Sequence, residues 1–175
     1  MRDALAEGVG SDTMKTLILL RHAKSSWKDT NLDDFDRPLN GRGKRSADLL
    51  RVFLKGREFS PEFVLCSPAL RARQTVEIVF DGLVQPPEIK YDRLLYLASV
   101  AQLLEIISRV ERERSQVVLV GHNPGIEELF THLTGIDKHF PTATMASLAL
   151  NTENWDELGT AGADLRWLTT PKELE

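Results

Sequence analysis

Residues 16–22 have the sequence Thr-Leu-Ile-Leu-Leu-Arg-His, which gives the strongest indication of the fold. The first five of these residues form a short, continuous apolar run, typical of a β-strand that is buried on both faces. Two later runs, Phe63–Cys66 and Val117–Val120, have the same character. Because such strands occur where helices cover both faces of a sheet, the three runs predict a buried and mostly parallel sheet.

Segments with helical periodicity separate these runs. Apolar residues recur at spacings of three and four in four stretches: 49–54, 69–79, 100–110 and 126–133. Ser99 and Gln102 form a capping-box pattern at the start of the third stretch, and Gly135 follows the fourth. Two further strands are expected over Ser147–Leu150 and Leu165–Leu168. The alternation of strands and helices predicts an α/β sandwich.

The length of 175 residues is sufficient for about one domain. We assign residues 14–175 to a single domain. Residues 1–13 are small, acidic and aperiodic, so we expect them to form a disordered extension. The composition, 42% hydrophobic and 27% charged, is that of an ordinary globular protein.

Charge and cysteine content exclude several classes of protein. The chain has 22 Lys and Arg against 26 Asp and Glu, a net charge of −4, whereas a non-specific nucleic-acid binder needs a net basic face. The longest apolar run is too short to span a bilayer. Cys66 is the only cysteine, which excludes an internal disulfide and a four-cysteine zinc site. Because no signal sequence opens the chain, we expect a cytoplasmic protein that binds neither nucleic acid nor membrane.

Polar motifs follow all three buried runs. They are Arg21–His22 after the first, Ser67–Pro68 with Arg71 after the second, and Gly121–Pro124 after the third. Ser67 and Asn123 are expected to cap helices. Ligands of open α/β sheets bind beyond the carboxyl ends of the strands, and helix N-termini bind anions. The sequence therefore predicts one pocket, lined by two arginines and two histidines, that suits a phosphoryl group.

The residue types of this pocket suggest distinct roles. Arg21 and Arg71 each present a planar fork of donors to phosphoryl oxygens, and His122 and Asn123 are further candidates for substrate binding. A neutral imidazole is a good nucleophile toward phosphorus, and nearby guanidinium groups favour the neutral form. One of His22 and His122 attacks while the other, protonated, stabilises the transferred group. Neither a metal ion nor a cofactor is required.

Other motifs have simpler interpretations. Cysteine-dependent phosphatases place five residues between nucleophile and arginine, but only four separate Cys66 from Arg71, so Cys66 is interpreted as a buried strand residue. The histidines lack HExxH spacing, which gives no support for a metal site. The charged run at 111–114 is interpreted as a solvated helix end. The tryptophans are expected to be packing anchors: Trp27, Trp155 and Trp167.

Three of these motifs together resemble the signatures of the histidine phosphatase superfamily, which is phosphoglycerate mutase-like. They are Leu19–Ala23, Ser67–Thr75 and Gly121–Pro124, in that order. Two further details, Arg21–Ser25 and Asp36–Leu39, are similar to the SixA-type phosphohistidine phosphatase branch. The resemblance extends over most of the chain.

The resemblance implies both an architecture and a mechanism. The architecture is a three-layer α/β/α sandwich around a mixed, mostly parallel sheet. In the implied mechanism, His22 is the nucleophile and forms a phosphohistidine intermediate. Arg21, Arg71 and His122 complete the phosphate pocket, and hydrolysis proceeds without a metal by in-line transfer to His22 and then to water.

Two positions depart from the family pattern. Ala23 stands where many members have glycine. The stretch 93–98 lacks the glutamate that usually serves as the general acid. Asp34 or Asp36, in the charged loop after the first strand, is then the candidate proton donor, or no donor is needed when the leaving group is an imidazole.

These observations predict a phosphatase that acts on phosphohistidine in a protein. A small-molecule phosphomonoesterase or mutase is the first alternative, and its partner would be a small phosphorylated molecule. A non-catalytic phosphate-binding module is the second alternative.

Overall fold

A six-stranded sheet forms the centre of the computed structural model, which describes residues 14–57, 59 and 61–175. The strands are β1 (Thr16–Arg21), β2 (Phe63–Cys66), β3 (Glu88–Tyr91), β4 (Gln116–Gly121), β5 (Met145–Leu150) and β6 (Ala163–Thr169). Their order across the sheet is β3-β2-β4-β1-β5-β6. The first four in this order are parallel, whereas β5 and β6 are each antiparallel to the preceding strand. The extension expected at 1–13 lies outside the described residues.

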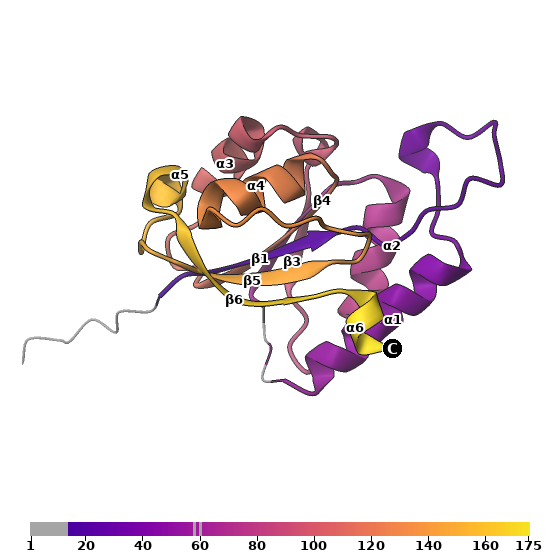
Figure 1. Ribbon diagram of the computed structural model, residues 1–175, viewed down its shortest axis with the longest axis horizontal. Coiled ribbons are helices and arrows are strands. Elements are labelled where there is room, and N and C mark those ends of the chain that lie inside the picture. The colour runs from indigo at the N-terminus through magenta and orange to yellow at the C-terminus, as the bar shows by residue number, and fades with distance from the viewer. Residues whose placement is uncertain (1–13, 58, 60) are drawn as a thin grey trace, which may run out of the picture.

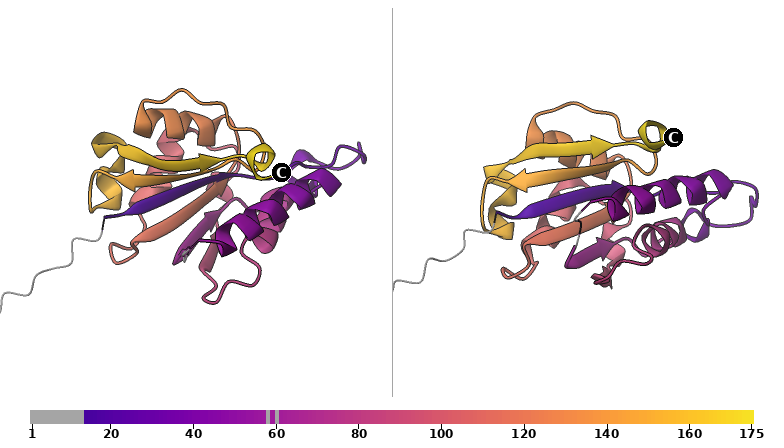
Figure 2. Two further views of the ribbon diagram at one scale, coloured as in Figure 1. Left: turned by 60° about the horizontal axis from the view of Figure 1, so that its bottom comes forward. Right: turned by 90° about the horizontal axis from the view of Figure 1, so that it is seen from below.

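Helices cover both faces of this sheet. They are α1 (Gly41–Lys55), α2 (Leu70–Val79), α3 (Val100–Ser108), α4 (Gly125–Thr134), α5 (Leu158–Ala161) and α6 (Pro171–Leu174). The helices α1 and α2 lie on one face with α6 beside α1, and α3, α4 and α5 lie on the other (Figure 1 and Figure 2). This arrangement confirms the predicted three-layer α/β/α sandwich with a mixed, mostly parallel sheet.

Alternation along β1 explains why two helical layers are needed. Leu17 and Leu19 pack toward α3 and α4, whereas Ile18 and Leu20 pack toward α1 and α2, and all four are fully buried. Successive side chains of a strand point to opposite faces, so a wholly apolar strand requires cover on both sides. Burial of one such side chain contributes about 2 kcal/mol.

Two predicted helix ends are confirmed and two are wrong. Ser99 and Gln102 form the capping box of α3, and Gly135 ends α4 in the left-handed region with a φ of 70°. Ser67 and Asn123 do not cap helices, because α2 and α4 begin further along the chain. Both side chains instead make hydrogen bonds at the pocket described below.

Strand β3 has no counterpart among the sequence predictions. All four of its residues are exposed, so it lacks the apolar pattern by which the other strands were recognised. It pairs with β2 at one edge of the sheet. An edge strand without a buried face leaves little signal in the sequence.

The tryptophans differ from one another in burial. Trp155 is buried and Trp167 is half-buried against Phe53, as expected of packing anchors. Trp27 is 64% exposed, so the prediction of a packing anchor there is wrong. The guanidinium of Arg37 lies 3.8 Å from the centre of the Trp27 ring, a cation–π contact on the surface.

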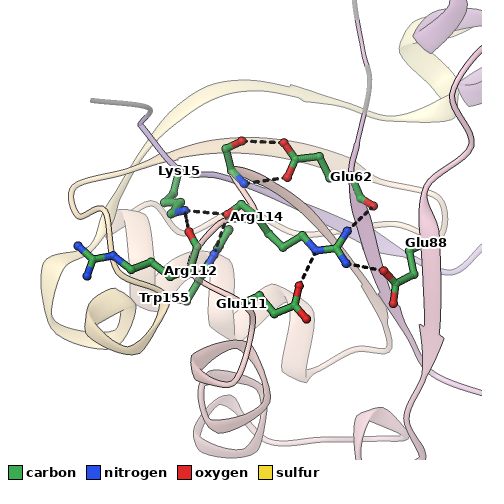
Figure 3. A network of polar contacts seen from close by, with 8 residues as sticks. Lys15, Glu62, Glu88, Glu111, Arg112, Arg114 and Trp155 are labelled. Carbon is green, nitrogen blue, oxygen red and sulfur yellow. Dashed lines mark hydrogen bonds and ion pairs between the residues drawn. The ribbon is translucent and has the colours of Figure 1, made fainter. Parts of the chain in front are cut away.

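The charged run at 111–114 is not a solvated helix end, because α3 ends at Ser108. Arg114 forms ion pairs with Glu88 and Glu111, and its guanidinium also donates to the Glu62 carbonyl (Figure 3). Its position beside Glu88 ties the loop before β4 to the edge strand β3.

A buried lysine adds to these contacts. Lys15 donates through its ammonium group to the carbonyls of Arg112 and Arg114, and Trp155 donates to the Arg114 carbonyl at 2.9 Å (Figure 3). The strands β1 to β4 all begin near this group. We call Lys15, Glu62, Glu88, Glu111 and Arg114 the amino-end network.

Candidate active site

The carboxyl ends of β1 and β4 bring the two predicted histidines together. In these parallel neighbours Arg21 lies opposite Gly121, and the backbone N–H of His22 donates to the Gly121 carbonyl at 3.1 Å. His22 and His122 follow directly, and the centroids of their rings are 4.9 Å apart. Residues distant in sequence therefore share one pocket at the edge where ligands bind in α/β sheets.

Arg71, the second residue of α2, lies against both rings. Its Nε is 3.2 Å from Nε2 of His22, and its Nη2 is 3.3 Å from Nδ1 of His122. The exposed fractions of His22, Arg71 and His122 are only 7%, 4% and 4%. A buried guanidinium between two imidazoles concentrates positive charge where an oxyanion would lie.

The hydrogen bonds of His22 fix its ring proton. Nδ1 is 2.8 Å from the carbonyl oxygen of Ala23. A carbonyl only accepts, so Nδ1 carries the proton and Nε2 keeps its lone pair. That lone pair accepts from Nε–H of Arg71. Nε2 is therefore the nitrogen of His22 that can attack an electrophile.

His122 is held in the opposite tautomer. Arginine only donates, so Nδ1 of His122 accepts from Arg71 and the ring proton lies on Nε2. Nε2–H then donates to Oγ of Ser67, 2.7 Å away. Ser67 is fully buried and accepts a second bond from the backbone N–H of Ala69 at 3.3 Å. The side chain predicted to cap a helix thus orients an imidazole.

Both imidazoles are neutral near pH 7. Burial lowers the pKa of His22 to about 4; the hydrogen bond to Ala23 acts in the opposite direction, and the charges of Arg71 and Arg21 add to the lowering. Burial, the neighbouring His22 and Arg71 lower the pKa of His122 to about 3. A phosphoryl dianion that enters the pocket would raise both pKa values, because it stabilises the protonated rings.

Arg21 and Asn123 lie beside this group and share a partner. Nη1 of Arg21 donates to the Phe140 carbonyl at 2.6 Å, and Nδ2 of Asn123 donates to the same oxygen at 3.2 Å. Nδ2 of Asn123 also donates to Glu127 at 2.9 Å. Nε of Arg21 and Oδ1 of Asn123 are buried without a hydrogen-bond partner. Burial lowers the pKa of Arg21 from its usual value. These unused polar atoms leave capacity for a ligand or a water molecule.

The two candidate proton donors differ sharply in position. Asp34 accepts from Nη2 of Arg71 at 2.8 Å and from the Tyr96 hydroxyl at 2.7 Å, both at Oδ2. Burial acts to raise the pKa of Asp34, but the hydrogen bonds from Tyr96 and Arg71 outweigh it and lower the pKa. Asp36 is exposed, and none of the hydrogen bonds or ion pairs of the described residues joins its side chain to the pocket. Of the two carboxylates, only Asp34 contacts a residue of the pocket.

Three residues support the pocket, and for Ala143 and Tyr96 no such role was predicted from the sequence. Thr75 accepts from the backbone N–H of Ala23 at 3.0 Å and donates to the Arg71 carbonyl at 2.6 Å, so it joins β1 to α2. Ala143, with a φ of 62°, donates its N–H to the carbonyls of Arg21 and His22. Tyr96 lies edge-on to His122 with ring centroids 5.3 Å apart. The stretch that carries Tyr96 was notable only for lacking a glutamate.

Two further observations concern the parts of the chain that the structure describes. No group of three or more His, Cys, Asp or Glu side chains there is arranged to hold a metal ion. No helix in those parts is long and apolar enough to cross a membrane. Cys66 is fully buried in β2 as predicted, and burial raises the pKa of its thiol.

Comparisons with known proteins agree with the fold. A family model of the histidine phosphatase superfamily (branch 1) matches residues 17–94. An uncharacterized chloroplastic protein of Arabidopsis thaliana is 31% identical over 170 residues, which cover 90% of this chain and 78% of that protein.

Solved structures are similar over nearly the whole length. A candidate phosphohistidine phosphatase SixA from Nakamurella multipartitia superposes with a TM-score of 0.80 and 29% identity, covering 90% of this chain and 96% of that one. The protein histidine phosphatase SixA complexed with tungstate superposes with a TM-score of 0.78 and 26% identity, and the match covers 91% of this chain and 99% of that one.

A sandwich with two imidazoles and a guanidinium gathered at its carboxyl edge has the architecture of an enzyme that handles phosphoryl groups. The chain belongs to the histidine phosphatase superfamily, in its SixA-type branch, and is a phosphatase.

Proposed function

We propose that this phosphatase removes the phosphoryl group from phosphohistidine in a protein, by way of a phosphohistidine intermediate on His22. The observation that carries the proposal is the environment of His22 Nε2. This nitrogen carries the lone pair of the ring because Nδ1 donates its proton to the Ala23 carbonyl, and the lone pair accepts from Nε–H of Arg71 at 3.2 Å. A neutral nucleophile beside a fixed cation is what attack on an anionic phosphorus requires.

The reaction has two balanced steps. In the first, Nε2 of His22 forms a bond to phosphorus as the bond between phosphorus and the leaving nitrogen or oxygen breaks. Arg21, Arg71 and His122 stabilise the charge on the non-bridging oxygens. In the second, water attacks phosphorus, the bond to His22 breaks, and inorganic phosphate leaves with His22 restored.

The leaving group determines whether a proton donor is needed. An imidazole that is protonated on its other nitrogen departs as a neutral ring, so a phosphohistidine substrate needs no acid. An alkoxide requires a proton, and Asp34 is the carboxyl group that lies against Arg71. In the hydrolytic step the Asp34 carboxylate can accept a proton from the attacking water. Asp36, exposed and outside the pocket, is the weaker candidate.

An exposed aromatic side chain favours a macromolecular substrate over a small one. Trp27 lies in the loop that follows His22, is 64% exposed, and stacks with Arg37 at 3.8 Å. Tryptophan and arginine are the residue types that contribute most to protein interfaces. The names of the similar SixA structures, which refer to protein histidine and phosphohistidine phosphatases, support the same substrate class.

Replacement of the nucleophile tests the mechanism. His22→Ala should lower kcat on 4-nitrophenyl phosphate by at least about 1000-fold, because it removes the attacking group. The matched control is His132→Ala, since His132 is exposed and bonds to the Gly159 carbonyl. Wild-type enzyme labelled with radioactive phosphate should keep the label in alkali and lose it in acid. Loss of less than tenfold in His22→Ala would contradict the assignment.

A comparison of substrates tests the finer proposal. The wild type is assayed on 4-nitrophenyl phosphate, 3-phosphoglycerate and a phosphohistidine protein, with a chelator present. We expect the highest kcat/KM on the phosphohistidine protein. Trp27→Ala should lower that value about tenfold and leave the aryl phosphate within about twofold, because an exposed interface tryptophan contributes only to the larger substrate. Preference for 3-phosphoglycerate would favour the small-molecule phosphatase or mutase instead.

We propose that residues 14–175 act as one domain, that catalysis needs no metal ion, and that the protein works in the cytoplasm. Full activity after exhaustive chelation is the result expected for metal independence. Expression of a fluorescent fusion in the source cells tests the location.

A further inference from the structure

The Asp34 carboxylate forms an ion pair with Arg71, the guanidinium that a phosphoryl substrate would bind. Each of the three side-chain nitrogens of Arg71 already has a partner: Nε has His22, Nη1 has the Asp34 carbonyl, and Nη2 has both His122 and the Asp34 carboxylate. The carboxylate oxygen is 2.8 Å from Nη2, the distance of a phosphoryl oxygen on arginine. A phosphoryl oxygen that binds to Nη2 of Arg71 therefore competes with the Asp34 carboxylate.

Tyr96 is the second group that holds Asp34 in place. Its hydroxyl donates to the carboxylate oxygen that also accepts from Arg71, at 2.7 Å. Its ring packs edge-on against Phe35, the next residue after Asp34, with centroids 5.1 Å apart. The same ring lies 5.3 Å from the ring of His122. Tyr96 thus contacts the loop and the pocket at once.

The backbone around Tyr96 is fixed by close packing. The preceding turn, η2 (Arg93–Leu95), is capped by Asp92 and anchored by Leu95, which is buried. Beyond Tyr96, the Ala98 carbonyl lies so near the start of α4 that a Cβ on Gly125 would be 2.1 Å from its oxygen. Only glycine permits this approach. The hydroxyl of Tyr96 is therefore presented by a rigid segment, whereas Asp34 lies on the long loop after β1.

We propose that Tyr96 is a positioning residue for hydrolysis. Its hydroxyl holds the Asp34 carboxylate on Arg71 until a phosphoryl group displaces it, and then keeps the same carboxyl group beside the leaving atom. A phosphoryl dianion next to Asp34 favours the protonated carboxyl, and a tyrosine hydroxyl can bond to either form. The inference deepens the proposed function and rests on it.

Binding of inorganic phosphate, measured by titration calorimetry, tests the displacement without any turnover. Asp34→Asn removes the competing charge and should bind phosphate about fivefold more tightly than the wild type, as expected from loss of a half-exposed ion pair. Tyr96→Phe keeps the ring and loosens the carboxylate, and should bind about threefold more tightly, since one hydrogen bond is lost. Asp33→Asn is the matched control, because it makes the same change in charge one residue away and Asp33 is exposed.

Steady-state kinetics test the positioning. On an alkyl phosphate, Tyr96→Phe should lower KM about threefold and kcat about tenfold, because the acid is less well placed. On 4-nitrophenyl phosphate, whose leaving group needs no proton, kcat should stay within about twofold. A merely structural role for Tyr96 predicts the opposite for binding, with weaker phosphate affinity and an equal loss of kcat on both substrates.

The phosphate titrations and the kinetics test the role of Tyr96, whereas the His22→Ala variant tests the proposed nucleophile. Unchanged or weaker phosphate binding by Tyr96→Phe and Asp34→Asn overturns the inference, as does an equal loss of kcat on both substrates. Tighter phosphate binding by both variants, together with a loss of kcat in Tyr96→Phe on the alkyl phosphate alone, supports the role of Tyr96. A fully active His22→Ala contradicts the proposed nucleophile, and the phosphate titrations remain interpretable in that case because they need no reaction.

Discussion

The amino and carboxyl ends of the sheet differ in how far their charged side chains are paired. At the amino end, Arg114 is surrounded by Glu88, Glu111 and the Glu62 carbonyl, and the buried Lys15 ammonium donates to two backbone carbonyls (Figure 3). At the carboxyl end, Asp34 is the only carboxylate with an ion pair to the buried Arg71 among the described residues.

This difference in charge pairing indicates that the amino-end network is structural, whereas the pocket at the carboxyl end is a candidate binding site. Charged side chains that are paired with one another have no free donors or acceptors for a ligand. They contribute to stability by joining separate segments of the chain. At the carboxyl end, two imidazoles are kept neutral by burial, and polar atoms of Arg21 and Asn123 have no partner. Such unsatisfied groups are costly in a folded protein and are characteristic of places that bind a ligand.

The largest expected effect is on activity at the carboxyl end. Arg71→Lys should lower kcat/KM by about 100- to 1000-fold, because an ammonium group cannot contact both imidazoles and a phosphoryl group at once. We expect the free energy of unfolding to change by less than about 1 kcal/mol, since a positive charge remains next to Asp34. Activity within fivefold of the wild type would contradict the central place given to this guanidinium.

The next effect is a loss of stability in acid. His22 and His122 have folded pKa values of about 4 and about 3, below the ordinary value of 6.5. The unfolded chain therefore binds more protons between pH 6.5 and about 4, so the free energy of unfolding falls as the pH is lowered through that window and is fully retained above it. From pH 7 to pH 5 the loss should be roughly 3 kcal/mol.

Urea unfolding at pH 7 and pH 5 measures this loss. His22→Gln should lose about half as much as the wild type, because one buried imidazole is removed. His132→Gln, which alters an exposed histidine, should behave like the wild type. An identical loss in His22→Gln would mean that other groups cause the pH dependence.

A smaller effect is expected at the amino end, and it concerns stability alone. Arg114→Ala should lower the free energy of unfolding by about 1 to 2 kcal/mol, because three contacts of a half-buried side chain are lost together. Arg109→Ala, which breaks one exposed pair with Glu105, should cost less than about 0.5 kcal/mol. Neither variant should change kcat/KM on 4-nitrophenyl phosphate by more than about twofold. A large loss of activity in Arg114→Ala would contradict the view that the amino end contributes to stability alone.

The smallest effect concerns backbone strain beside the pocket. Leu97 has a φ of 53° and a side chain that is 56% exposed, so a leucine there adopts a left-handed conformation without burying its apolar surface. Leu97→Gly should raise the free energy of unfolding by about 0.5 kcal/mol, and Leu97→Val should lower it by about 1 kcal/mol. Thermal unfolding of the two variants measures both changes. Destabilisation by glycine would show that Leu97 makes a packing contribution that outweighs the strain.

Much of the fold was predictable because its signals are local. Each apolar run was followed by the polar residues that now line the pocket, and the spacing in stretch 100–110 predicted α3 with its capping box. The edge strand β3 escaped prediction because it buries no face. Ser67 and Asn123 were misassigned because a polar residue before a helix resembles a cap, whatever its side chain meets in space.

The pocket was predictable in its members and not in its arrangement. Asp34 and Asp36 are equivalent in the sequence, two residues apart on the same charged loop, yet one contacts Arg71 and the other faces solvent. Tyr96 carried no signal at all, because its partner Asp34 is far away in the chain.

The sequence by itself determined the alternation of helices with buried strands and the four side chains that follow those strands, because apolar periodicity and chain order are properties of neighbouring residues. The tertiary structure alone decided which tautomer each imidazole adopts, that both rings are neutral, and which carboxylate and hydroxyl lie against Arg71. Proton positions and ion pairs depend on burial and on distances of a few ångström between segments remote in the chain, and no local pattern encodes those distances.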